Sequence, residues 1–150
     1  MNVHLVGIGG AGMSALAHLY LEQGDSVSGS DALSSTVTEA LAAAGARVAT
    51  GHDAGNLEAA EAVIVSTAIP ADNPELMEAR RRGLRVVSRG KAAAELARGR
   101  RQVAVAGTHG KTTTTTMVAA TLGALDPLVL SGGRLPGSIY NSRFGRGKVA

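Results

Sequence analysis

The chain has 150 residues, which is enough for one full hydrophobic core or for one domain and part of a second. Apolar residues make up 45% of it and aromatic residues only 2%, so alanine, valine and leucine must build the core. There is no cysteine, which excludes disulfides and thiolate metal sites, and glycines interrupt the amino-terminal apolar stretch before it reaches signal or membrane length. We therefore expect a cytoplasmic protein with no membrane partner.

The net charge of +3 hides a strong asymmetry between the two parts of the chain. Residues 1–79 contain one base and ten acids, a net charge of −9, whereas residues 80–150 contain fourteen bases and two acids, a net charge of +12. A basic half is typical of proteins that bind nucleic acid, but these bases have no interleaved aromatic residues. We interpret them as solvated helix faces near an anionic nucleotide or an acidic partner surface, and we expect no nucleic-acid partner.

Short apolar runs alternate with segments of helical periodicity along most of the chain. Strands are predicted at residues 3–6, 26–30, 47–50, 62–66 and 85–88, and helices at 13–23, 38–44, 73–82 and 91–98. This alternation predicts a Rossmann-like α/β fold, with a parallel sheet and right-handed crossovers, over residues 1–99. Residues 100–150 are expected to begin a second such unit, with strands at 103–106 and 128–130 around a helix that starts at Lys111.

A first glycine loop, residues 7–12, has the G-x-G-x-x-G pattern between a predicted strand and a predicted helix. Gly7 is expected to allow the tight turn, Gly9 to let the backbone approach a pyrophosphate, and Gly12 to let helix and strand pack closely. Asp31 ends the next strand and is expected to accept hydrogen bonds from a nucleoside. Because the first 79 residues contain one base, backbone amides and the helix end must hold any diphosphate. The pattern alone fits any dinucleotide or nucleoside diphosphate.

A second glycine loop, residues 107–112, has the outline of a phosphate-binding loop that opens a helix. Val105 departs from the strict pattern, which has glycine at that position. Lys111 is expected on the β- and γ-phosphates of ATP, and the Thr112 hydroxyl on Mg²⁺. For His109 two interpretations stay open, because either its side chain or only its backbone can serve the loop.

Together these motifs resemble the Mur ligases, and the resemblance covers the whole chain. The matching segments are Gly7 to Ser14, Ser28 to Asp31, Gly51-His52 with Asn56, Ala68-Ile69 with Asp72 to Glu75, and Gly107 to Thr114. The phosphate loop matches even in its non-glycine opening. This set of motifs, in this order along the chain, is highly specific for the family.

The resemblance implies an ATP- and Mg²⁺-dependent ligase that joins L-alanine to the muramate carboxylate of UDP-N-acetylmuramate through an acyl phosphate. It assigns the UDP-sugar to Gly7, Gly9, Gly10, Ala11, Gly12, Met13, Asp31, His52, Ser66, Ala68 and Asn141. It assigns the ATP phosphates to Gly107, Thr108, His109, Gly110, Lys111, Thr112 and Thr113, with Lys111 catalytic and Thr112 at the metal.

In the family, the position of Val149-Ala150 leads into an acidic segment that supplies a metal-binding glutamate. We therefore expect this chain to be an amino-terminal fragment that binds UDP-sugar without turnover. Three alternatives stay open: a murein-peptide-recycling ligase on the same UDP-sugar, a nicotinamide-dependent oxidoreductase, and a binding module without chemistry. The oxidoreductase leaves the Lys111 loop unexplained, and the recycling ligase typically departs from the first loop seen here. The sequence does not predict the oligomeric state.

Overall fold

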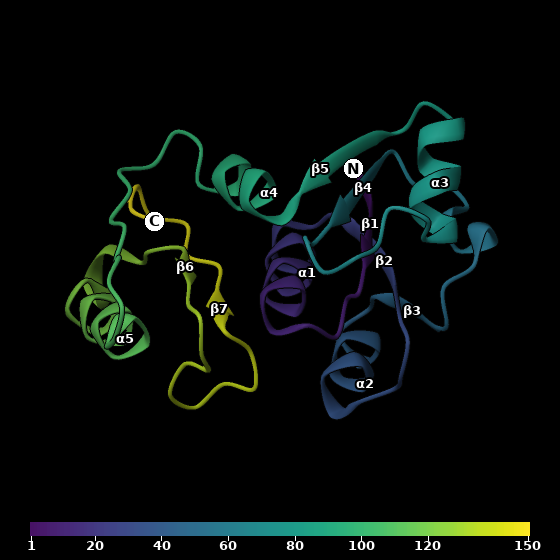
Figure 1. Cartoon of the computed structure of the whole chain (residues 1–150). Coiled ribbons are helices and arrows are strands. Elements are labelled where there is room, and N and C mark those ends of the chain that lie inside the picture. The colour runs from purple at the N-terminus through teal and green to yellow at the C-terminus, as the bar shows by residue number, and fades with distance from the viewer.

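A computed structural model describes all residues from 1 to 150 (Figure 1). The strands of its larger unit are β1 (Asn2–Val6), β2 (Ser26–Asp31), β3 (Arg47–Thr50), β4 (Ala62–Val65) and β5 (Arg85–Ser88). The helices of this unit are α1 (Ala11–Gln23), α2 (Thr36–Ala43), α3 (Pro74–Arg81) and α4 (Arg89–Leu96), with a short 3-10 helix η1 (Ala54–Leu57). All five strands are parallel, in the order β3-β2-β1-β4-β5, which confirms the predicted α/β fold class.

Alternating residues of the central strands fill two separate cores, one on each face of the sheet. On one face Leu5 and Ile64 pack with Leu16 and with other residues of α1, α2 and α4. On the other face Val6 packs with Ala79 of α3 and with residues of η1. Helices therefore cover both faces, and the edge formed by the carboxyl ends of the strands stays accessible to ligands.

The strand order reverses direction between β1 and β4, which are hydrogen-bonded neighbours in the middle of the sheet. Val6 at the end of β1 is paired with Val65 at the end of β4. In open α/β sheets, ligands bind in the crevice outside the carboxyl ends of the strands at such a reversal. The loops that follow Val6 and Val65 are therefore the candidate ligand-binding loops of the sheet.

The smaller unit contains α5 (Lys111–Thr121), η2 (Gly123–Leu125), β6 (Val129–Leu130) and β7 (Ser142–Arg143). The strand predicted at 103–106 does not form, whereas the strand predicted at 128–130 is present as β6, which pairs with β7 in an antiparallel arrangement. A strand needs a hydrogen-bonded neighbour along its length. In the segment 103–106 only Val103 has such a neighbour, because its amide donates to the Ala150 carbonyl at 2.8 Å. Just before the segment, Arg101 forms an isolated bridge to Val149.

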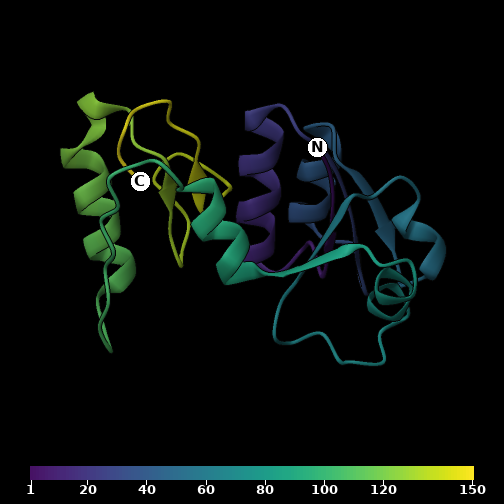
Figure 2. The same cartoon turned by 90° about the horizontal axis from the view of Figure 1, so that it is seen from above.

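The two units meet where the carboxyl-terminal segment lies along α1 (Figure 2). The His18 and Tyr140 rings stack with their centroids 3.9 Å apart. Ser142 Oγ donates to the Ala15 carbonyl at 3.0 Å, and the Phe144 amide donates to Glu22 Oε2 at 3.0 Å. Stacking and hydrogen bonds therefore join the two units, and Tyr140 also packs against the apolar core of the larger unit. None of the helices has the length and apolar content that a bilayer span requires.

Candidate functional site

The first glycine loop connects β1 to α1 at the reversal point. Gly7 has φ = 77°, in the left-handed region that glycine tolerates, so the predicted role of Gly7 in a tight turn is supported by its backbone. Ile8 is fully buried and packs over β2, where a Cβ atom on Gly29 would lie 2.7 Å from Ile8 Cδ1. The loop is therefore held against the sheet by this apolar side chain and by the amides of Gly7 and Ile8, which both donate to the Ser30 carbonyl.

Only part of the predicted diphosphate cradle has free amides. The Gly9 amide donates to Asp31 Oδ2 at 2.8 Å, and the amides of Gly10 and Met13 donate to carbonyls of the loop itself. The amides of Ala11 and Gly12 have no acceptor in the protein, and no side chain caps α1. We therefore narrow the expected anion cradle to the first two amides of α1, where the helix dipole also favours negative charge.

Gly12 does not serve the close helix–strand packing expected of it. A Cβ atom there would lie 2.5 Å from Nη1 of Arg89, which begins α4 just beyond β5. The Arg89 side chain thus crosses the amino-terminal end of α1. This corrects a second expectation, because a side-chain cation from the basic half of the chain does reach the first loop.

Other predicted residues gather at the same edge. The Gly51 amide donates to the Asp31 carbonyl at 2.7 Å, which places His52 beside the end of β2. Ser66 Oγ accepts a hydrogen bond from the Ala68 amide at 3.3 Å and so shapes the loop after β4. Ile69 of the same loop, which belongs to the Ala68-Ile69 segment of the family resemblance, lies 3.2 Å from a Cβ built on Gly7.

Asn141 connects the smaller unit to this edge. Its side chain is buried, and its Nδ2 donates to the Ala11 carbonyl at 3.3 Å. The structure therefore brings Asn141 to the first glycine loop from a position 130 residues away in the sequence. This contact places the Asn141 side chain beside the first residue of α1.

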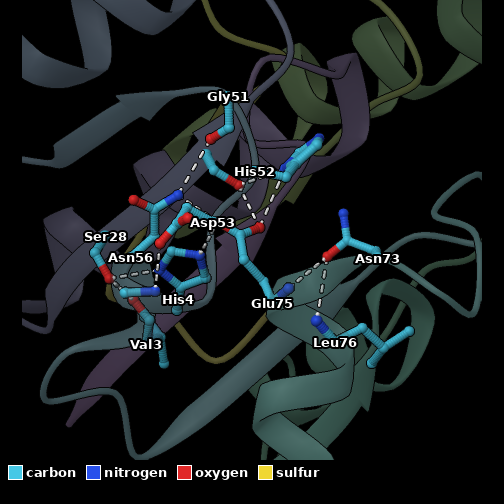
Figure 3. Close-up of polar contacts among 12 residues, drawn as sticks. Val3, His4, Ser28, Gly51, His52, Asp53, Asn56, Asn73, Glu75 and Leu76 are labelled. Carbon is cyan, nitrogen blue, oxygen red and sulfur yellow. Dashed lines mark hydrogen bonds and ion pairs between the residues drawn. The ribbon is translucent and has the colours of Figure 1, made fainter.

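A buried polar network lies below the same edge, centred on Glu75 in the first turn of α3 (Figure 3). Asn56 Nδ2 donates to Glu75 Oε1 at 2.6 Å, and Ser30 Oγ donates to Glu75 Oε2 at 2.6 Å. His52 Nδ1 lies 3.1 Å from Oε2, and Nε2 of the fully buried His4 lies 3.6 Å from Oε1. Burial raises the pKa of Glu75, but the hydrogen bonds from Ser30 and Asn56 and the nearby His4 ring outweigh this effect and bring the pKa to about 2.

Sequence reasoning missed this network. Glu75 was expected in the predicted helix 73–82 and in the Asp72 to Glu75 segment of the family resemblance, with no role in a site. Asn73 Oδ1 caps this helix by accepting hydrogen bonds from the Glu75 and Leu76 amides. A signal existed in the strand pattern, because Ser28 and Ser30 recur with period two in a central strand and share a face with His4. Polar residues at inward positions of a buried strand require partners, and these are His4 for Ser28 and Glu75 for Ser30.

The second glycine loop has its own uncapped helix. Gly110 has φ = 74° and precedes α5, whose first three amides have no acceptor in the protein and no side-chain cap. By contrast, Ser35, Asn73 and Ser88 cap α2, α3 and α4 with their side chains. Lys111 Nζ donates to the Gly107 and Thr108 carbonyls at 2.6 and 3.0 Å, so the ammonium group lies within the loop.

Thr112 faces the segment after β6, because a Cβ atom on either Gly132 or Gly133 would lie 3.6 Å from Thr112 Oγ1. His109 is exposed and its side chain makes no hydrogen bond. No group of three His, Cys, Asp or Glu side chains lies close enough to hold a metal ion. The loop thus offers a hydroxyl, an ammonium group and free amides, which suit a nucleotide phosphate better than a free metal ion.

The main cavities of the surface lie elsewhere. One of about 60 Å³ is apolar and lies between α5 and β6, lined by residues such as Val118 and Leu128. Another of about 400 Å³ lies between the units and is lined in part by His18, Thr116 and Ser142. Residues of the two glycine loops are absent from the linings of these two cavities and of three others. Figure 2 shows the amino-terminal ends of α1 and α5 on the same side of the molecule.

Comparison with known proteins agrees with this geometry. The family model described as "Mur ligase family, catalytic domain" matches residues 2–101, which include the first loop and the whole sheet. The chain belongs to the Mur ligase family. Two curated Mur ligases, the UDP-N-acetylmuramate–L-alanine ligases of Burkholderia cenocepacia and Burkholderia mallei, are 52% and 53% identical to it over 148 residues. Each match covers 97% of this chain and 32% of the relative, so the chain spans about a third of the length of these relatives.

Solved Mur ligases share the arrangement of both units. The UDP-N-acetylmuramate–alanine ligase of Thermotoga maritima matches with a TM-score of 0.89 and 35% identity, over 99% of this chain and 36% of that one. The murein peptide ligase of Psychrobacter arcticus matches with a TM-score of 0.89 and 33% identity, over 99% of this chain and 34% of that one. The backbone alone therefore does not separate these two activities.

Proposed function

We propose that this Mur ligase chain supplies the UDP-sugar site and the phosphate loop of an ATP-dependent ligase that joins L-alanine to UDP-N-acetylmuramate. The observation that carries the proposal is the pair of uncapped helices, α1 and α5, whose free amides open on the same side of the molecule. Each suits a phosphate group. Two such sites are what a reaction between a nucleotide sugar and ATP requires.

The chemistry assigned to the second loop is phosphoryl transfer. The γ-phosphoryl group of ATP passes to the muramate carboxylate, and the alanine amine then displaces phosphate from the acyl phosphate to form the amide. Lys111 would neutralise charge on the transferring group, and the free amides of α5 would orient the phosphates. The Thr112 hydroxyl would contribute to holding Mg²⁺, and nucleotide phosphates would supply further oxygen ligands.

At the first loop, UDP-N-acetylmuramate is the ligand that the family favours over a nicotinamide dinucleotide. The amides of Ala11 and Gly12 would hold the diphosphate with help from Arg89, and Asp31 and His52 would face the nucleoside. Ser66, Ala68 and Asn141 would line the sugar side of the site. L-alanine is favoured over a preformed peptide by the 52% and 53% identity to alanine ligases.

The test is ligand-induced stabilisation of the chain. A ligand that binds the folded state alone raises the melting temperature, so UDP and UDP-N-acetylmuramate should each raise it while NAD should not. Ala11→Asp places a negative charge on exposed α1 amides without disturbing the core, and it should weaken UDP binding at least tenfold by repulsion.

The matched control is Ala59→Asp, which makes the same charge change at an exposed position on the opposite edge of the sheet. This control should bind UDP as the unaltered chain does. A melting temperature that responds to NAD and to neither UDP compound would overturn the proposal.

A further inference from the structure

The position of His52 is set from below by the buried carboxylate of Glu75. Ser30 Oγ lies 2.6 Å from Glu75 Oε2 and 2.8 Å from His52 Nδ1, while His52 Nδ1 itself lies 3.1 Å from the same Oε2 (Figure 3). The three groups form a closed triangle. The directions of its hydrogen bonds follow from which of the three groups carries a proton that it can donate.

Glu75 is ionised at neutral pH, because hydrogen bonds to its carboxylate outweigh the effect of burial and hold its pKa at about 2. An ionised carboxylate only accepts hydrogen bonds. The single hydroxyl hydrogen of Ser30 therefore points to Glu75, which leaves Ser30 Oγ as an acceptor towards His52. Both neighbours of His52 Nδ1 are then acceptors, so Nδ1 carries the proton.

In a neutral imidazole with its proton on Nδ1, the other nitrogen is a hydrogen-bond acceptor. His52 Nε2 makes no hydrogen bond in the protein and is not among the buried unpaired polar atoms. The side chain is 24% exposed and follows Gly51, whose amide is bonded to the Asp31 carbonyl at the edge of the sheet. An acceptor nitrogen is thus presented where the nucleoside is expected.

We propose that Glu75 is a positioning residue which, with Ser30, holds His52 in the Nδ1-protonated form so that Nε2 accepts a hydrogen bond from the nucleoside. This inference rests on the proposed function. The donors that uridine offers are the imide N–H of the base and the ribose hydroxyls. Recognition of a donor by a fixed acceptor selects against nucleosides that lack this donor, because the buried network cannot reverse its hydrogen bonds without removing a donor from Glu75 Oε2.

The protonation state is tested without any ligand. Nitrogen-15 NMR of the histidine rings should show His52 Nδ1 as the protonated nitrogen and Nε2 as the unprotonated one. In Glu75→Gln an amide replaces the acceptor, so the preference should be lost or reversed, whereas Glu39→Gln, an exposed carboxylate on α2, should leave it unchanged. If Glu75→Gln does not fold, Ser30→Ala removes the second acceptor and should weaken the same preference. A proton on Nε2 in the unaltered chain would overturn the inference.

The recognition step is tested with UDP analogues. UDP methylated at the base N3, 2′-deoxy-UDP and 3′-deoxy-UDP each lack one donor, and one of them should bind about tenfold more weakly than UDP, the value of one hydrogen bond. Glu75→Gln should remove that difference while UDP still binds. Equal binding of all four compounds would overturn the acceptor role. Failure of the unaltered chain to bind UDP at all would instead reject the proposed function, while the NMR result would still decide the protonation state.

Discussion

The buried charge of Glu75 affects the stability of the folded chain and lies below the sheet edge where the UDP-sugar is proposed to bind. Its reference pKa is 4.5 and its folded-state pKa is about 2, so the ionised side chain stabilises the folded chain fully above pH 4.5. That contribution is lost as the pH falls from 4.5 towards 2, because the unfolded chain takes up the proton first. The shift corresponds to on the order of 3 kcal/mol.

We predict that acid sensitivity follows this one carboxylate. In urea unfolding between about pH 7 and about pH 3, the free energy of unfolding should fall steeply for the unaltered chain and much less for Glu75→Gln. The variant should also be less stable at pH 7 by about 1–3 kcal/mol, since buried donors lose an acceptor. Glu39→Gln should retain the steep fall. A Glu75→Gln variant with the same pH dependence as the unaltered chain would show that other carboxylates control acid unfolding.

At the scale of elements, sequence patterns predicted the larger unit well. Its five strands and four helices were expected within about two residues of their observed ends, because glycines and caps such as Asn73 interrupt each apolar run. The segment 103–106 has an equally apolar pattern and forms no strand, since pairing depends on neighbours that the pattern does not specify. The 3-10 helix η1 and strand β7 were not predicted for the same reason.

The site shows the same division between local and long-range information. Gly7 and Gly110 were predictable because local backbone geometry demands glycine there, and both have a positive φ. Arg89 over Gly12, and the contacts around Glu75, depend on how distant elements meet. The spacing of residues in one sequence does not specify which distant elements come into contact.

A prediction at this scale concerns β2, where Gly29 lies under the first loop. A Cβ atom at Gly29 would lie 2.6 Å from the Leu5 carbonyl oxygen and 2.7 Å from Ile8 Cδ1, so Gly29→Ala must push the loop from the sheet. We expect a loss of about 1–3 kcal/mol in the free energy of unfolding and weaker UDP binding. Gly90→Ala in α4 is the control, since a Cβ there meets nothing within 4 Å and alanine favours helix. Equal stability of the two variants would contradict the assigned contact.

At the scale of the whole molecule, the two units differ in how many hydrophobic residues they bury. The buried residues of both hydrophobic clusters lie before position 99, with Tyr140 packed against the first cluster, whereas α5 has no buried residue. Val103 and Met117 are exposed, at 51% and 65%. We therefore propose a domain boundary near residue 99, with the smaller unit held mainly through Asn141, Ser142 and their neighbours on α1.

This difference predicts two levels of protection in hydrogen exchange. Amides of β1, β2 and β4 should exchange at rates set by global unfolding, while those of α5 should exchange through local opening, with few buried contacts to resist it. Mass spectrometry of peptides from the two units would measure this directly. Tyr140→Ala removes the ring stacked on His18 and should speed exchange in β7 but leave β1 unchanged, and Ile139→Ala, an exposed neighbour, is the matched control. Uniform protection across both units would mean that the chain unfolds as one cooperative body and that the boundary near residue 99 is not a boundary of stability.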